Sequence, residues 1–250
     1  MNIFSELISF TSIIIIILSV FQTIVGVGIL VLGTPILLLF GLEMIEVMTV
    51  LLPLSILNSL SNIFFLQYKF SEIKIDKNMR NYFFLICFPG IFLGLYVLKI
   101  FNDSINFNLL VSLVIWFFLV ASYVNKKNNF KVSDSLKKNL IFLTGIVHGV
   151  TNSGGSLLSM LIVNTYNKGL NYIRYQIIFF YLFLAIFHYL SIFLIFKFNF
   201  LNDLKLNYFL CLIIGILIGN VLSNKVNTNQ LKNLIFAIAF ISSIFLIVQN

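Results

Sequence analysis

Two short polar interruptions occur within apolar stretches of this chain, at residues 22–28 (QTIVGVG) and 148–156 (HGVTNSGGS). Asn and Ser are frequent N-caps of helices, and glycine lets another group approach the bare backbone closely. A helix that begins at such a place presents amides without intrahelical partners and about half a positive charge. Helix N-termini of this kind bind anions. The residue types therefore indicate non-covalent binding of an anion.

The candidate binding residues come from these two interruptions and from one polar helix face. Asn58, Ser59 and Asn62 share that face, because they recur at helical spacings of three and four. They either line a path or bond between helices, and the glycines serve either the site or close helix packing. The full set is Gln22, Thr23, Gly26, Gly28, Asn58, His148, Asn152, Ser153, Gly154, Gly155 and Ser156.

Three ionisable residues lie in or beside the apolar stretches. His148 precedes the second interruption and could couple anion movement to a proton, or it could stay neutral and bond to a neighbouring helix. His188 is either a second proton relay or a structural residue. Arg174, at the start of an apolar stretch, either attracts anions at the inner mouth or anchors to lipid headgroups.

Composition places the chain in a membrane. Of its 250 residues 60% are hydrophobic and 10% are charged, and the mean hydropathy is +1.06. Soluble domains carry about 25% charged residues, so this chain needs lipid as a solvent. The net charge of +8 comes from short loops, which favours the positive-inside rule over a nucleic-acid partner. Cys87 and Cys211 lie inside apolar stretches and predict neither a disulfide nor a metal or cofactor site.

The lengths of the apolar segments predict how they cross the membrane. A spanning helix needs about 20 residues. Segments 139–150 and 155–166 would each reach only roughly 18 Å, so we expect a re-entrant hairpin that returns to its starting side. The apolar segments are 7–22, 27–40, 44–67, 82–98, 107–124, 139–150, 155–166, 172–196, 207–222 and 233–248.

The second half of the sequence repeats features of the first. Gly26 falls on Gly154 at an offset of 128, and the pair Gly90/Gly94 matches Gly215/Gly219, a spacing typical of helix packing. The expected fold is an all-α polytopic membrane protein of two inverted repeats, each a broken or re-entrant helical hairpin plus three transmembrane helices. The expected units are a first repeat at 1–124, a basic cytoplasmic linker at 125–138 and a second repeat at 139–250.

Lysine-rich loops predict the orientation. The two basic clusters are expected in the cytoplasm. With each broken segment beginning and ending on one side, only Lys99, Lys197 and Lys205 are left outside, and both termini are outside. The clusters are Lys69, Lys74, Lys77 and Arg80, and then Lys126, Lys127, Lys131, Lys137 and Lys138.

The glycine motifs resemble a known family. Gly26-Val27-Gly28 with Gly33-Thr34-Pro35 and Gly41 resembles the first-half signature of the TauE/SafE sulfite exporter family. His148-Gly149, Ser153-Gly154-Gly155, Gly169 and Arg174 resemble the second-half signature of one of its branches. The resemblance covers essentially the whole chain. It implies a permease that moves sulfur-containing anions, sulfite and sulfoacetate among them. The family's run of three glycines reads Gly26-Val27-Gly28-Ile29 here, and the proline after the second glycine cluster is absent.

The combined expectation is a secondary transporter (permease) for a small anion in the inner membrane of a bacterium. The anion is expected to be sulfite or an organosulfonate, held at half-helix N-termini near the midplane, with alternating access between the repeats. Membrane lipid, the anion and protons as coupling ion are the expected partners. A passive anion channel and a scaffold subunit are the alternatives. An enzyme is not expected, because the sequence has no HExxH motif and Ser153 with His148 is its only conceivable dyad.

Overall fold

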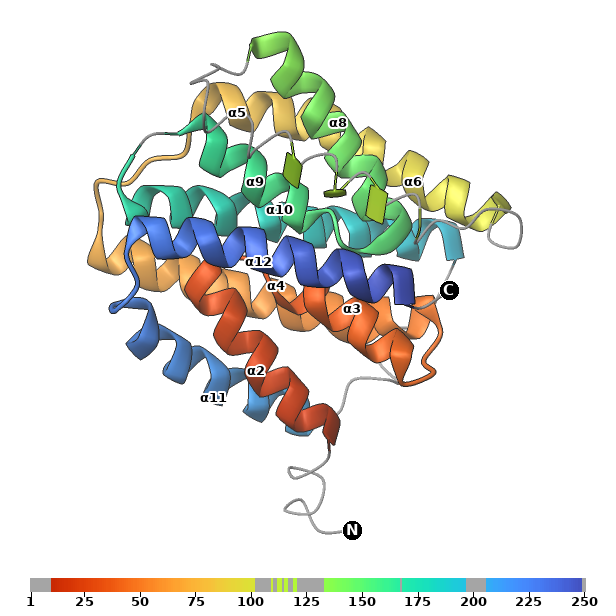
Figure 1. Cartoon of the computed structure of the whole chain (residues 1–250), viewed down its shortest axis with the longest axis horizontal. Coiled ribbons are helices and arrows are strands. Elements are labelled where there is room, and N and C mark those ends of the chain that lie inside the picture. Colours follow the sequence, from red (N-terminus) through yellow and green to blue (C-terminus); the bar gives the residue numbers. More distant parts are fainter. Residues whose placement is uncertain are drawn as a thin grey trace.

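Every regular element in the described part of the chain is a helix. The computed structural model describes residues 10–101, 109, 112–113, 115–116, 119–120, 133–166, 168–196 and 206–248. Figure 1 shows the arrangement of the helices. Their bounds are α2 Phe10–Val25, α3 Ile29–Leu39, α4 Met44–Lys69, α5 Lys77–Tyr82, the π-helical turn η1 Phe83–Cys87, α6 Phe88–Phe101, α8 Asp134–Thr151, α9 Gly155–Thr165, α10 Leu170–Phe196, α11 Leu206–Ser223 and α12 Thr228–Val248.

Five helical stretches within the described residues are long and apolar enough to cross a membrane. They are Met44–Lys69, Lys77–Phe101, Leu170–Phe196, Leu206–Ser223 and Thr228–Val248. The second of these joins α5, η1 and α6, and its π-helical turn comes just before Pro89, which has no amide hydrogen to donate to the preceding turn. The expected span at 107–124 falls largely outside the described residues.

Both predicted interruptions are present as helix breaks. α3 and α9 have 11 residues each and would reach roughly 16 Å, about half of a bilayer's hydrocarbon thickness. In each pair the second helix turns back after the break instead of continuing the first (Figure 1). α8 begins at Asp134, inside the expected linker, because the Ser133 hydroxyl accepts a hydrogen bond from the Leu136 amide and caps the helix.

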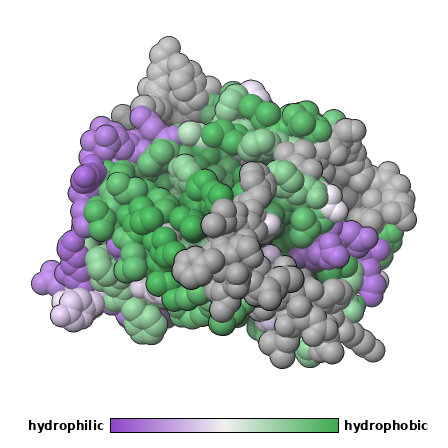
Figure 2. Space-filling model, turned by 90° about the horizontal axis from the view of Figure 1, so that it is seen from below, coloured by the Kyte–Doolittle hydropathy of each residue, from purple (hydrophilic) through white to green (hydrophobic). Residues whose placement is uncertain are grey.

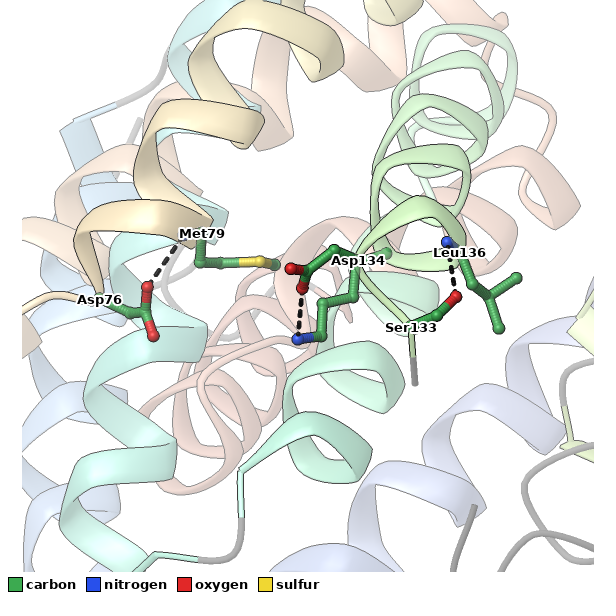
Figure 3. Close-up of polar contacts among 6 residues, drawn as sticks. Asp76, Met79, Ser133, Asp134 and Leu136 are labelled. Atoms are coloured by element: carbon green, nitrogen blue, oxygen red, sulfur yellow. Dashed lines mark hydrogen bonds and ion pairs between the residues drawn. The ribbon is translucent and has the colours of Figure 1, made fainter. Parts of the chain in front are cut away.

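The basic loops gather at one end of the helix bundle. Lys69 Nζ lies 3.0 Å from Asn224 Oδ1, which joins the end of α4 to the turn after α11. Gln176 Nε2 donates to the Lys74 carbonyl at 2.9 Å, which joins α10 to the loop after α4. In Figure 1 this end is on the left, while the loop after α3 and the end of α12 lie on the right. Figure 3 shows two N-caps of the basic end, Asp76 on the Met79 amide and Ser133 on the Leu136 amide.

Glycine pairs hold two helix pairs at close range. α6 packs on α8, where a Cβ added at Gly149 would lie 3.0 Å from the Gly94 Cα. α11 packs on α2, where a Cβ added at Gly219 would lie 2.6 Å from the Thr23 Cβ. The Gly90/Gly94 and Gly215/Gly219 pairs therefore serve helix packing, as expected from the sequence. α4 and α10 pack against each other between these two helix pairs.

Large apolar side chains cover the outside of the bundle. Figure 2 shows them as a green band, with hydrophilic residues at the left margin, the basic end. On α11 and α12 the exposed members include Leu210, Ile213, Leu217, Val221, Phe240, Ile241, Ile244 and Val248. A surface this apolar between polar ends is what a hydrocarbon environment requires, and the chain is an integral membrane protein.

Candidate functional site

The first break places glycine where no other residue fits. α2 ends at Val25, and Gly26 follows with φ +96, in the left-handed region that glycine adopts without strain. Its amide donates to the Gln22 carbonyl at 2.8 Å. A Cβ on Gly26 would lie 2.8 Å from Ile177 Cγ2, so the break packs directly against α10.

The amides that open α3 are already bonded to protein groups. The Ile29 amide donates to Gln22 Oε1 at 3.1 Å, and the Leu30 amide donates to the Tyr181 hydroxyl at 3.0 Å. Gln22 Nε2 in turn donates to Ser59 Oγ at 3.0 Å. In this conformation the start of α3 is therefore capped from inside the protein, and an anion would have to displace a side chain to reach it.

The polar face of α4 bonds to α2. Asn58 Nδ2 donates to Ser19 Oγ at 2.7 Å, and Asn62 Nδ2 donates to Thr23 Oγ1 at 3.2 Å. The Thr23 hydroxyl donates to Asn58 Oδ1 at 3.3 Å. All four side chains are fully buried. Of the two interpretations of this face, helix-to-helix bonding is the one present in this conformation.

The second break has a different cap. α8 ends at Thr151, Asn152 has φ 59, and α9 begins at Gly155 after the N-cap Gly154, which has no side chain to offer. The Ser156 amide donates to the Ser153 carbonyl at 3.2 Å, and the Ser156 hydroxyl donates to the same carbonyl at 2.9 Å. The start of α9 is thus capped by its own loop, with no side chain from another helix corresponding to Gln22 or Tyr181.

The two breaks meet in the interior. Asn152 Nδ2 donates to Thr34 Oγ1 on α3 at 2.9 Å, while Asn152 Oδ1 is buried without a partner. A Cβ added at Gly155 would lie 3.1 Å from Val31 Cγ2 and would also strike the ring of Tyr181. Tyr181 therefore touches both breaks, because its hydroxyl caps α3 and its ring packs on the first residue of α9.

One face of α10 runs past both breaks. Arg174, Tyr181 and His188 are seven residues apart, which puts them on one side of the helix at steps of roughly 10 Å. Arg174 is 3% exposed, its guanidinium donates to the Thr23 carbonyl, and its Nε has no partner. Among the described residues the one ion pair is Lys137–Asp134, and no described carboxylate neutralises Arg174.

The two histidines of the chain contact each other at the other end of this face. The ring centroids of His148 and His188 lie 4.8 Å apart with an interplanar angle of 65°. Both rings are fully buried, and none of their four nitrogens has a hydrogen-bond partner in the described part of the chain. The neighbouring-helix hydrogen bond that a structural His148 would make is not present in this conformation.

A comparison with protein families agrees with this architecture. The family model described as Sulfite exporter TauE/SafE matches residues 11–246, nearly the whole chain. The chain belongs to the TauE/SafE family. The family is one of membrane transporters and not of enzymes. No curated protein matches the chain, and no solved structure matches it.

The geometry of this TauE/SafE chain aligns its two breaks by an offset of 126. Gly26 and Asn152 both have positive φ, and each amide donates to the carbonyl four residues earlier, of Gln22 and of His148. Gly26 and Asn152 thus have the same local geometry at an offset of 126, whereas Gly154, at the offset of 128, has a φ of -60. The same offset pairs Gln22 with His148. Gln22 caps the helix after its break, whereas the two ring nitrogens of His148 have no hydrogen-bond partner among the described residues.

Tyr181 is the site residue that the sequence analysis missed. Its spacing of seven from both Arg174 and His188 is visible in the sequence, and that spacing was the available signal. Of the predicted residues, Gln22, Thr23 and Asn58 join the first break, whereas the hydroxyls of Ser153 and Ser156 donate to carbonyls of the second break's own loop. Gly28 is the N-cap residue of α3, and a Cβ added there would lie 2.9 Å from the Gln22 amide nitrogen.

A polar cleft lies at the basic end of the TauE/SafE chain, near the start of α10. Its volume is about 620 Å³, and Tyr172 of α10 is part of its wall. Arg174 follows Tyr172 by two residues along α10 and does not line the cleft. The lining residues are Glu72, Ile73, Lys74, Ile75, Asp76, Lys77, Asn78, Lys168 and Tyr172.

Proposed function

We propose that this chain is a secondary transporter of a small sulfur-containing anion, sulfite or an organosulfonate. Arg174 is the observation that carries the proposal, because it is a buried cation at a helix break with no carboxylate partner among the described residues. A buried charge is costly unless it is paired. An anionic substrate would supply the missing charge, and membership of the sulfite exporter family supports that substrate class.

The chemistry of the guanidinium fits oxyanions. Its planar fork presents several N–H donors that match the oxygens of a sulfite or sulfonate group. One donor is held by the Thr23 carbonyl, which fixes the fork beside Gly26, and Nε remains free to donate. The starts of α3 and α9, with Asn152 and Ser153, would complete the binding site as the anion passes.

The mechanism that we propose is alternating access between two inverted repeats. The site residues are buried, so this conformation is closed to both sides. Movement of the α8–α9 hairpin against the α2–α3 hairpin would open the site to the cleft at the basic end, where Lys74, Lys77 and Lys168 attract anions. By the positive-inside rule this end faces the cytoplasm, in the inner membrane of a bacterium, with both termini outside.

Substitution of Arg174 tests the proposal. In proteoliposomes loaded with sulfite, we expect Arg174→Gln to lower kcat/KM for sulfite counterflow by at least about thirty-fold, since truncating a buried charge partner costs about 2–5 kcal/mol. Arg174→Lys keeps the charge without the planar fork, so its kcat/KM should lie between the values for the wild type and Arg174→Gln. Lys225→Gln, at an exposed site of the same end, is the matched control and should stay within about two-fold.

Thermal unfolding in detergent separates function from folding. Removing an unpaired buried cation should leave the protein as stable or more stable, so Arg174→Gln should combine an unchanged or higher unfolding midpoint with lost transport. Wild-type-like counterflow in a folded Arg174→Gln protein would refute the role of Arg174. Sulfite conduction without counterflow would instead identify a channel.

A further inference from the structure

The buried histidine pair has a geometry that a structural role does not explain. His148 comes from α8 and His188 from α10, and their rings touch at 4.8 Å between centroids. A buried polar atom without a hydrogen bond is unfavourable, and here four such nitrogens lie together. A site of this kind is expected to take up a hydrogen-bonding partner at some stage of the protein's cycle.

A proton is the partner that fits two imidazoles. Each neutral ring has one N–H donor and one acceptor nitrogen, so a small rotation lets one ring donate to the other. One added proton charges the pair and strengthens that bond. A second proton would place two like charges in contact within a water-poor interior. The pair is therefore suited to bind one proton, not two.

The surroundings leave the charge of that proton uncompensated. α8 packs against α6, η1, α9 and α10, none of which carries a carboxylate. Besides the histidines, their titratable side chains are Cys87, Tyr96, Lys99, Tyr172, Arg174, Tyr175, Tyr181 and Tyr189. α4, which packs on α10, carries Glu46, Tyr68 and Lys69, all near its two ends. α8 carries Asp134, Lys137 and Lys138 in its first turns, roughly 15 Å or more from His148 along the helix.

The second break offers the missing negative charge. Gly154, the N-cap of α9, lies against His148, since a Cβ on Gly154 would be 2.6 Å from the His148 Cβ. An anion at the start of α9 would therefore lie close to a proton on the pair. Each would favour binding of the other, and this coupling is reciprocal.

We propose that His148 and His188 form a single proton site that couples the carrier to protons, one proton moving with each anion. The proposal rests on the anion transport proposed above and adds the coupling ion to it. Opening of the occluded site would hydrate the pair and allow its protonation. Closure would then favour the state in which proton and anion are both bound, or both absent.

Imidazole resonances test the proton site independently of transport. The chain has two histidines, so ¹⁵N-histidine labelling, with a purification tag free of histidine, reports on this pair alone. Between pH 8 and pH 5 we expect the pair to gain one shared proton, and 10 mM sulfite to move this uptake to higher pH. His188→Gln should abolish the effect of sulfite. Two rings that stay neutral throughout, or that take up two protons independently, would overturn the proposal.

Proton flux in proteoliposomes tests the coupling. With an internal pH dye and an imposed sulfite gradient, the wild-type protein should move about one proton per anion. His148→Gln and His188→Gln should each move well under one proton per sulfite, whatever the remaining rate of sulfite exchange. Ser191→Ala is the control, because Ser191 is buried one turn further along α10 and bonds only to the Phe187 carbonyl of its own helix.

The outcomes separate this proposal from the proposed function. Sulfite exchange with unchanged proton flux in both histidine variants would refute the coupling and leave the carrier intact. Absence of wild-type exchange of sulfite or sulfonates would refute the anion carrier. In that case the resonances of the two histidines would still decide whether the pair binds a shared proton. Variant folding is verified by the unfolding midpoint of each purified protein.

Discussion

At the scale of residues, buried polar atoms fall into two groups around the breaks. Gln22, Asn58 and Tyr181 are bonded to neighbouring helices and fix the first break in place. His148, His188, Asn152 and Arg174 each keep at least one buried atom without a partner. Well-bonded groups stabilise one conformation, whereas unpaired groups favour any state that supplies a ligand or water. We therefore expect the first group to act as scaffold and the second to take part in transport.

Gln22→Ala tests the scaffold role. Loss of this side chain leaves the Ile29 amide and the Ser59 hydroxyl without Gln22 as partner in the interior, which should lower the free energy of unfolding by about 1–3 kcal/mol. Thermal unfolding in detergent measures the effect. Gln67→Ala is the control, because Gln67 is exposed and bonds only to the Tyr175 hydroxyl. Equal midpoints for the two variants would contradict the assignment.

At the scale of elements, glycine contacts hold α8 against α6 and α2 against α11. α8 lies against α6 with backbone touching backbone, at Gly145 on Gly90 and at Gly149 on Gly94. α2 lies against α11 in the same manner, with the small side chains Ser19 and Thr23 in place of two of the glycines. In lipid, helices associate through such close van der Waals contact, because burial of apolar surface gives little net advantage there. These contacts set the position of each break relative to α10.

Gly149→Ala should disturb the second break through this contact. The new Cβ would lie 2.9 Å from the Leu95 amide nitrogen, part of the backbone, which cannot rotate away as a side chain can. We expect a loss of about 1–3 kcal/mol in stability and weaker sulfite counterflow. Gly169→Ala is the matched control, since a Cβ there has no heavy atom within 4 Å. If Gly149→Ala had the same unfolding midpoint as the control, α6 and α8 could move apart at little cost, and the contact would not hold the break in place.

At the scale of the whole molecule, the described lysines gather at one end of the bundle, and Lys99 is the one described lysine at the other end. Lys99, which donates to the Ile195 carbonyl at 3.2 Å, lies at the end opposite to Lys69 and Lys225. Lys126, Lys127, Lys131, Lys197 and Lys205 fall outside the described residues. The distribution predicts a fixed orientation in the membrane, with the polar cleft on the cytoplasmic side.

Cysteine labelling tests that orientation. The native Cys87 and Cys211 are fully buried and should not react with a membrane-impermeant maleimide. On intact spheroplasts Lys99→Cys should be labelled, whereas Lys225→Cys should be labelled only after the membrane is opened. Labelling of both variants from outside would contradict the hairpin topology, and labelling of Lys225→Cys alone would reverse the orientation.

Composition and local chemistry alone determined the membrane environment, the two helix breaks and the family resemblance. Gly26 and Asn152 act through their own backbone conformation, which depends on few neighbours, and so the sequence located the breaks. The pairing of the halves by 128 residues was inexact because glycine and asparagine both adopt positive φ, so two glycines need not correspond.

Only the tertiary structure decided which side chains meet. Arg174 reaches Thr23, Tyr181 reaches Leu30, and His188 reaches His148 across large separations along the chain. These meetings depend on the rotation of α10 about its axis. In a soluble protein the apolar stripe of a helix reveals that rotation, but here lipid and core are equally apolar and both faces of α10 carry hydrophobic residues. Packing, and not sequence pattern, therefore turned the Arg174–Tyr181–His188 face toward the breaks.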